Sequence, residues 1–233
     1  MRVFAKGFNF SQDGPGNRLV YHLSGCNMRC IWCSNPEGMR ADAGKDITAA
    51  ELVKECESCR LMFFSGGGVT FTGGEATLQL DELIELRRLL KEKGIHTALE
   101  TNGSSERLAE LYPYLDWLIM DFKHFDGGLM RKYTNLDNAA VKRNFEYNCK
   151  TGREQHIRIP LIRGFNAESP QGFADYFSAF CTEKTDFEFL PYHEYGKEKW
   201  TEEYLVKDGF IEEGTLERFK EIFSSRGLTV VET

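Results

Sequence analysis

The stretch LSGCNMRCIWCSNPE, residues 23–37, places Cys26, Cys30 and Cys33 on one short loop. The apolar run 19–24 leads into this loop and predicts a β-strand, whereas the polar segment after it is rich in turn-forming residues. A closed zinc site or a fully ligated iron–sulfur cube needs four protein ligands. The three cysteines are therefore either unrelated thiols or the ligands of a metal centre with one open position.

Short β-branched or aromatic runs alternate with amphipathic stretches along the rest of the chain, which predicts parallel β/α units. We expect strands at 19–24, 69–72, 97–101, 117–122, 156–162 and 187–192, and helices at 49–63, 80–93, 106–111, 139–149, 170–181 and 216–225. Six units are fewer than a closed eight-fold barrel needs, so the predicted fold is α/β, a partial (β/α)6 barrel. Residues 1–18 predict a short N-terminal hairpin, and we expect residues 1–233 to form one domain.

Polar or glycine residues stand where most of these expected strands end, and the carboxyl ends of parallel strands are where such folds place their chemistry. Besides the three cysteines, the residues at or near strand ends are Gly73, Gly74, Glu75, Glu100, Thr101, Asp121, Lys123 and His193, and Arg158 lies within its strand. The sequence thus predicts one site at this end of the strands.

The composition, with 41% hydrophobic and 28% charged residues, is that of a globular protein. A formal net charge of −7 argues against nucleic acid or an anionic membrane surface as the main partner. The chain shows neither an apolar run long enough to span a membrane nor the apolar stretch of a signal peptide, so we expect a cytoplasmic protein with reduced thiols. The seven cysteines are then metal ligands or packed thiols.

Thiolate ligands select zinc or iron–sulfur clusters. The only other close cysteine pair is Cys56 and Cys59, and no His-x3–5-His pair accompanies it to complete a zinc site. The C-x3-C-x2-C spacing instead fits one face of a [4Fe-4S] cube that leaves one iron without a protein ligand. Trp32, between the second and third cysteines, is expected to shield the loop from water.

C-x3-C-x2-aromatic-C resembles the signature of the radical S-adenosylmethionine superfamily. Within that superfamily, DGPGNR (13–18), GGGVTFTGGEATLQ (66–79), ETNG (100–103), MDFK (120–123) and LPYHEYGKEKW (190–200) resemble the glycyl-radical-enzyme activating enzymes of the pyruvate formate-lyase type. The resemblance runs from about residue 8 to residue 226. It implies a radical SAM type of partial barrel.

The resemblance also implies two cofactors. Cys26, Cys30 and Cys33 would hold the [4Fe-4S] cluster, and S-adenosylmethionine would chelate its open iron. The contacts to S-adenosylmethionine would come from Trp32, Gly73, Gly74, Glu75, Lys123, Arg158 and His193. The structural alternatives are a strand-terminating turn at Gly73-Gly74-Glu75, a buried ion pair of Lys123 or Arg158 with a barrel carboxylate, and a purely structural His193.

Glu100, Thr101 and Asp121 end adjacent expected strands, and oxygen ligands favour hard ions. The resemblance implies a monovalent cation, Na+ or K+, at these residues, although the family has Asp where this chain has Glu100. The alternative is a protonated or lysine-paired carboxylate.

The implied substrate is a protein. Asp13, Gly14 and Pro15 would contact the glycine-bearing segment of a partner glycyl radical enzyme, unless they only form a rigid turn, and Arg18 is interpreted as a surface charge. Flavodoxin or ferredoxin would donate electrons, and a monomer is expected. Only 29 residues separate Pro36 from Gly66, too few for the ferredoxin-like domain that some activating enzymes carry there.

We therefore expect an enzyme that abstracts hydrogen from a glycine Cα of a partner enzyme. One alternative is a radical enzyme acting on a small molecule such as a nucleoside precursor. A second is a non-catalytic iron–sulfur or zinc-binding protein.

Overall fold

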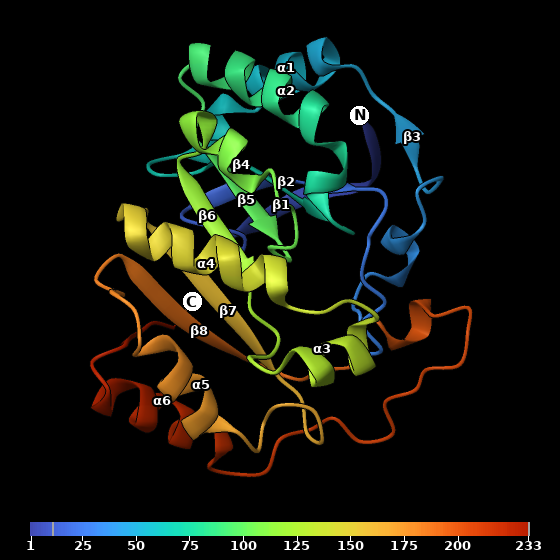
Figure 1. Cartoon of the computed structure of the whole chain (residues 1–233). Helices are drawn as coiled ribbons and strands as arrows, with labels where there is room; N and C mark the ends of the chain where they lie inside the picture. Colours follow the sequence, from blue (N-terminus) through green and yellow to red (C-terminus); the bar gives the residue numbers. More distant parts are fainter. Residues whose placement is uncertain (11, 233) are drawn as a thin grey trace. The chain divides into compact units, whose positions relative to one another are not determined.

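The computed structural model describes residues 1–10 and 12–232, and these form two compact units (Figure 1). The first unit comprises Met1–Asn27, Asn35–Thr101 and Ser105–Ile119, and the second comprises Met28–Ser34, Asn102–Ser104 and Met120–Thr233. The single domain expected from the sequence stays a prediction.

The first unit contains a mixed sheet with the strand order β3-β1-β2-β4-β5, and β6 follows β5 in that order. Strand β1 runs antiparallel to both β2 and β3, whereas β2, β4 and β5 are parallel to one another. Almost every residue of β2 is buried, as is usual for a central parallel strand covered on both faces. The bounds are β1 Arg2–Phe10, β2 Asn17–Leu23, β3 Lys45–Asp46, β4 Gly68–Gly73, β5 Thr97–Thr101 and β6 Trp117–Asp121.

Two α-helices, α1 and α2, pack against each other in this unit (Figure 1). α1, Ala49–Ser58, begins with the capping box that Thr48 and Glu51 predict. α2, Leu80–Glu92, buries leucines at i, i+3 and i+6 spacing, which turns one apolar face toward the core. Short 3-10 helices occupy Pro36–Met39, Arg60–Phe63, Ala76–Gln79 and Leu108–Tyr114.

In the second unit, β7 (Gln155–Leu161) is parallel to β8 (Thr185–Pro191), and β8 is parallel to the short β9 (Thr229–Val230). Helices α5 and α6 lie side by side next to β8 (Figure 1). The helices are α3 Gly127–Thr134, α4 Ala139–Thr151, α5 Pro170–Phe177 and α6 Thr215–Ser225, with a 3-10 helix at Lys197–Lys199.

Aromatic rings from several elements form the core of the second unit. Phe177 of α5 lies 4.7 Å from Phe187 of β8 between ring centroids, and Phe187 lies 5.3 Å from Phe223 of α6. Phe145 of α4 meets Phe177 edge to face at 5.0 Å. Such tilted and edge-to-face pairs stabilise a core beyond the area that they bury, so these rings join three helices to the sheet.

The structure confirms the predicted fold class, an α/β fold with mostly parallel strands and no closed barrel. The N-terminal hairpin is present, but its second strand is β2, the strand expected at 19–24, rather than a segment within residues 1–18. All six expected strands are present. The helix expected at 106–111 is instead the 3-10 helix Leu108–Tyr114, which contains Pro113. α3, β3 and β9 were not predicted.

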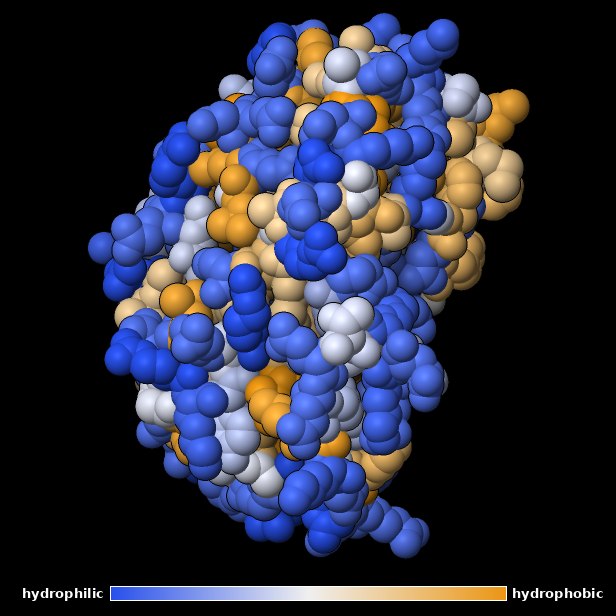
Figure 2. All heavy atoms as spheres, turned by 90° about the vertical axis from the view of Figure 1, so that its right-hand side faces the viewer, coloured by the Kyte–Doolittle hydropathy of each residue, from blue (hydrophilic) through white to orange (hydrophobic). Residues whose placement is uncertain are grey.

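Among the described residues, no helix is both long and apolar enough to cross a bilayer. Figure 2 shows that hydrophobic atoms on the face it draws form groups separated by hydrophilic ones. The large exposed apolar residues include Phe10, Leu61 and Phe64.

Candidate functional site

The first part of the cysteine loop is held by backbone hydrogen bonds within the first unit. The N–H of Cys26 donates to the carbonyl oxygen of Met39 (3.3 Å), and the N–H of Gly25 donates to that of Gly38 (2.9 Å). Glu75 donates its backbone N–H to the carbonyl oxygen of Gly25 (2.7 Å). The end of β4 and the start of the cysteine loop therefore lie against each other.

Gly73 and Gly74 are required by this close packing. A Cβ on Gly74 would lie 2.2 Å from the carbonyl oxygen of Gly25 and 2.3 Å from that of Gly38. Gly73 has a φ of +131°, which side chains disfavour, and its Cβ would lie 2.2 Å from the backbone nitrogen of Leu23. In the structure these glycines admit the backbone around the cysteine loop, and their contact with S-adenosylmethionine stays a prediction.

The Glu75 carboxyl group is 1% exposed and accepts several hydrogen bonds through Oε1. The donors are the Thr77 N–H (3.0 Å), the Thr77 hydroxyl (2.5 Å) and the Thr101 hydroxyl (2.7 Å). Thr101 ends β5, so this carboxyl group connects the ends of two neighbouring parallel strands. The structure thus brings Glu75 and Thr101 together, where the sequence assigned them to different ligands.

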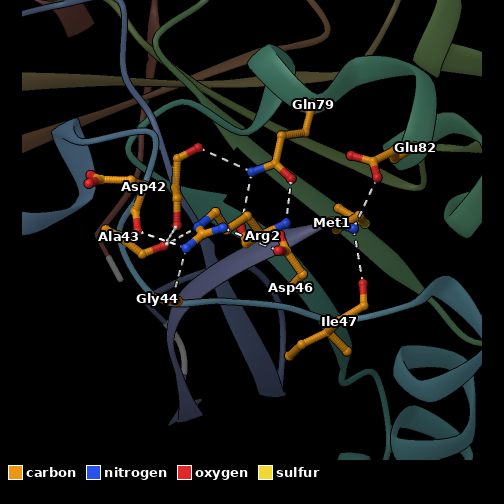
Figure 3. Close-up of polar contacts among 10 residues, drawn as sticks. Met1, Arg2, Asp42, Ala43, Gly44, Asp46, Ile47, Gln79 and Glu82 are labelled. Atoms are coloured by element: carbon orange, nitrogen blue, oxygen red, sulfur yellow. Dashed lines mark hydrogen bonds and ion pairs between the residues drawn. The ribbon is translucent and has the colours of Figure 1, made fainter.

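Gln79, the last residue of the motif GGGVTFTGGEATLQ (66–79), joins the start of the cysteine loop to β1 (Figure 3). Its Nε2 donates to the carbonyl oxygens of Arg2 (3.0 Å) and Ser24 (3.1 Å), while its Oε1 accepts from the Arg2 N–H (2.7 Å). The Arg2 guanidinium in turn binds the carbonyl oxygens of Ala43 and Asp42 (3.1 and 2.9 Å). No role for Gln79 was predicted from the sequence, although its place as the last, polar residue of the motif 66–79 is a usable signal.

The second part of the cysteine loop belongs to the second unit and lies on the end of α3. The N–H groups of Arg29 and Ile31 donate to the carbonyl oxygens of Thr134 (2.7 Å) and Tyr133 (3.3 Å). Trp32 is buried with its ring 4.6 Å from that of Phe165. These contacts fix the loop between its second and third cysteines.

Lys123 and Asp121, at the end of β6, form an ion pair. The Lys123 Nζ lies 2.6 Å from the Asp121 Oδ2, and the lysine side chain is largely buried. The Lys123 carbonyl oxygen accepts from the Asn166 side chain (2.9 Å), which fixes the backbone there. This is the lysine-paired carboxylate that the sequence left open for Asp121.

Arg158, Glu188 and His156 form a buried group on neighbouring strands. Arg158 of β7 stands opposite Glu188 of β8 in the register, and its Nε donates to Oε2 at 2.8 Å. The same oxygen lies 3.0 Å from the His156 Nε2. The predicted alternative, an ion pair of Arg158 with a barrel carboxylate, is therefore present, and sequence reasoning missed Glu188 because it lies inside an aromatic strand.

His193 follows β8 and is half-buried. Its ring stacks on the exposed Tyr195 with centroids 4.2 Å apart, and its Nδ1 accepts weakly from the Tyr195 N–H at 3.4 Å. Burial lowers the pKa of His193 below the ordinary histidine value, which favours the neutral ring at neutral pH. A neutral imidazole can both donate and accept a hydrogen bond.

Arg18 is buried, so its interpretation as a surface charge is wrong. It is 0% exposed, and it donates to the Thr70 hydroxyl (2.8 Å) and to the carbonyl oxygens of Val69 (2.6 Å) and Pro15 (3.2 Å). The Thr70 hydroxyl donates to the Asp13 carbonyl oxygen (2.6 Å). Burial lowers the pKa of Arg18 to about 10, so it stays charged at neutral pH.

Arg18 therefore supports the turn at Asp13, Gly14 and Pro15. This turn precedes β2, whereas Cys26 follows it, so the two lie at opposite ends of a strand about 20 Å long. Within the first unit, the structure does not bring the expected partner-binding residues next to Glu75 or Thr101.

The cysteine loop carries the type of donor that iron–sulfur centres use. All seven cysteines are thiols, and Cys26, Cys30 and Cys33 share one loop held by the backbone contacts above. In the described part of the chain, no three His, Cys, Asp or Glu side chains gather around one point as a single metal ion requires. The three thiolates that hold a [4Fe-4S] cube bind three different irons. Cys26, Cys30 and Cys33 therefore need not converge on one point to hold a cluster.

Cys56 is a packed thiol of α1. It is fully buried with its Sγ 3.8 Å from the Tyr21 hydroxyl, and burial raises its pKa to about 12. Thiolates, not thiols, bind metals. Cys59, at the end of the same helix, is half-exposed.

The fold and the cysteine loop define the class of protein. The profile of the Radical SAM superfamily matches residues 20–177, which include all three cysteines and most of both units. Streptococcus suis SuiB, solved with bound S-adenosylmethionine, has the same fold, with a TM-score of 0.69 and 15% identity over 91% of this chain and 49% of that one. The chain belongs to the radical SAM superfamily.

Relatives within the superfamily narrow the assignment. Pyruvate formate-lyase 1-activating enzyme of Escherichia coli K12 is 33% identical over 230 residues, 94% of this chain and 93% of that protein. A domain of the pyruvate formate-lyase-activating enzyme from Bacteroides vulgatus matches with a TM-score of 0.61 and 26% identity over 71% of this chain and 98% of that one. Within the superfamily, this chain is a member of the pyruvate formate-lyase-activating enzyme family. It is therefore an enzyme, and the non-catalytic alternative is wrong.

Proposed function

We propose that this protein converts a glycine of a partner glycyl radical enzyme, of the pyruvate formate-lyase type, into a glycyl radical. When bound, a reduced [4Fe-4S] cluster with S-adenosylmethionine supplies the chemistry: one electron cleaves S-adenosylmethionine to methionine and a 5′-deoxyadenosyl radical, which takes hydrogen from the glycine Cα. The observation that carries the proposal is the packing of Gly74 and Glu75 on the loop that bears Cys26.

The cysteine residues would hold the cluster, and the groups at the strand ends would bind S-adenosylmethionine. Glu75 and the adjacent backbone would accept from its ammonium group, and Lys123 and Arg158 would supply positive charge for its carboxylate and ribose. Glu188 orients Arg158 through Nε, so the rest of the guanidinium keeps a fixed direction. His193, neutral at pH 7, would contact the ribose, and Trp32 would exclude water from the loop.

A monovalent cation, Na+ or K+, at Glu100, Thr101 and Asp121 is a further part of the proposal. The Lys123 ammonium already neutralises Asp121, and the Thr101 hydroxyl donates to Glu75. The cation would therefore compete with Lys123 for Asp121. If it is required, S-adenosylmethionine binding will weaken when choline replaces both alkali ions; equal binding in choline contradicts this part.

The partner would contact the protein through an extended segment. Asp13, Gly14 and Pro15 lie one strand length from the cysteine end of β2, so a segment that touches both needs about six extended residues. We also propose flavodoxin or ferredoxin as the electron donor, a monomeric state and a cytoplasmic location.

An anaerobic assay tests the proposal. The reconstituted, reduced protein is mixed with S-adenosylmethionine and a pyruvate formate-lyase, and electron paramagnetic resonance is recorded. A doublet that collapses when the partner carries α-deuterated glycine supports the proposal. Cleavage of S-adenosylmethionine without a radical on any of the glycyl radical enzymes supplied favours the alternative, a small-molecule substrate.

A further inference from the structure

The short helix after His193 touches the end of the cysteine loop, and both belong to the second unit. The indole Nε1 of Trp200 donates to the carbonyl oxygen of Cys33 (3.0 Å), and the Nζ of Lys199 donates to that of Ser34 (3.2 Å). Gly196 packs on the same place, since a Cβ there would lie 2.4 Å from the Ser34 Cα. We call Gly196–Trp200 the latch segment.

The latch segment is itself fixed to the sheet. The Trp200 ring meets the Tyr204 ring edge to face at 5.5 Å, and the Tyr204 hydroxyl lies 2.8 Å from that of Tyr192. Tyr192 is buried just after β8 and donates its backbone N–H to the carbonyl oxygen of Leu161 of β7 (3.0 Å). The carbonyl oxygen of Cys33 is thus connected through three aromatic side chains to the end of the parallel strands.

The latch segment also begins three residues after His193. Lys197 within it forms an ion pair with Glu194 (2.9 Å), which holds the chain compact between His193 and Trp200. One continuous stretch therefore carries a proposed S-adenosylmethionine contact at one end and holds the third cysteine at the other.

We propose that Trp200 and Lys199 are positioning residues, which hold Cys33 at the place where it binds the cluster. They act on backbone carbonyl oxygens rather than on the thiol. A hydrogen bond to the backbone beside a metal ligand fixes that ligand's direction and tunes the metal's properties. The proposal rests on the proposed cluster, but the restraint on the loop exists without it.

The restraint is tested first in the cluster-free protein by amide hydrogen exchange. Trp200→Phe keeps an aromatic, although smaller, side chain and removes the indole N–H, and Lys199→Met removes the ammonium group. Lys207→Met, which changes an exposed lysine of the same region, is the matched control. We expect residues 30–35 to exchange about three- to tenfold faster in Trp200→Phe, the loss typical of one hydrogen bond, and faster still in the double variant. The control should match the wild type.

The effect on the cluster is tested in reconstituted protein by the rate of iron release to a chelator and by the cluster's midpoint potential. The rate of iron release and the midpoint potential should both change in Trp200→Phe. They should also change in Gly196→Ala, because the added Cβ pushes the latch segment off Ser34, but not in Lys207→Met. The inference is overturned if the double variant exchanges the amides of residues 30–35 and releases iron at the same rates as the wild type. A wild-type protein that binds no cluster refutes the proposed cluster instead, and the exchange result then still reports on the restraint.

Discussion

Thr101 and Glu75 show how one hydroxyl group can connect two strand ends. Thr101→Val removes the donor to the buried Glu75 Oε1 without a large change in volume. We expect the free energy of unfolding to fall by about 1–3 kcal/mol, since a buried acceptor loses a partner. Urea unfolding of the cluster-free protein under reducing conditions measures this free energy, with Thr201→Val, at an exposed position, as the control. Equal urea midpoints for the two variants would show that the contact between Thr101 and Glu75 does not stabilise the protein.

We expect Cys26, Cys30 and Cys33 to be cluster ligands and Cys56 to be a packed thiol. Cys30→Ala should lose nearly all iron after anaerobic reconstitution, because a cube that keeps two thiolate ligands is released. Cys56→Ala should keep the wild-type iron content, because that thiol is buried, has a raised pKa and faces Tyr21. Iron and sulfide analysis decides the point, and an unchanged iron content in Cys30→Ala would refute the ligand assignment.

At the scale of single residues, spacing and position near strand ends singled out the cysteine loop, Glu75, Lys123 and His193, whose roles as ligands stay predictions. Sequence reasoning missed Glu188, Gln79, Thr70 and the burial of Arg18. These side chains act on partners that are distant in sequence: Glu188 is 30 residues from Arg158, and Thr70 is 52 residues from Arg18. Such pairs depend on strand register, which a single sequence does not define.

Among the elements, α1 offers a direct test of a feature read from the sequence. The Thr48 hydroxyl accepts from the Glu51 N–H (3.2 Å), and the Glu51 carboxylate accepts from the Thr48 N–H (2.8 Å). Thr48→Ala should lower the free energy of unfolding by about 1 kcal/mol. Thermal unfolding measures it, and a change no larger than that in Thr201→Ala would show that the cap contributes nothing.

Helices with a regular apolar face were predictable, and α3 was not. α2 repeats leucine at helical spacing, whereas α3 begins with Gly127-Gly128, residues of low helix propensity. The side chain of Asp126 accepts from the Leu129 N–H (2.8 Å), and this cap sets where α3 begins. The sequence between 60 and 63 was predicted as a continuation of α1, but the helix ends at Ser58 and a 3-10 turn follows.

For the whole molecule, stability should fall as the pH drops from 7 to 5.5. Burial lowers the pKa values of His96, His124 and His193, and the Arg18 guanidinium lowers that of His96 further. The unfolded chain, with histidine pKa values near 6.5, then binds protons more tightly than the folded protein. The contribution of the neutral rings is thus fully present above about pH 6.5 and is lost as the pH falls below it.

Urea unfolding of the cluster-free protein at pH 7 and pH 5.5 measures this dependence. The interval lies above the range in which carboxylates take up protons, so the change reports on the histidines. A midpoint that stays constant or rises toward pH 5.5 would contradict the lowered pKa values.

The turn at residues 13–16, which precedes β2, is fixed largely through its backbone carbonyl oxygens. Arg18 and Thr70 bind the carbonyl oxygens of Pro15 and Asp13, and the left-handed Gly16 fits against Gly67, where a Cβ would lie 2.6 Å from the Gly67 nitrogen. The Asp13 carboxylate also accepts from the Asn9 side chain, so the fold places few demands on the side chain at position 15 but does use the one at position 13. A randomised library at position 15, with Asp13 and both glycines kept, should yield mostly folded proteins, in which the proposed contact of this turn with the partner can be varied without unfolding the enzyme.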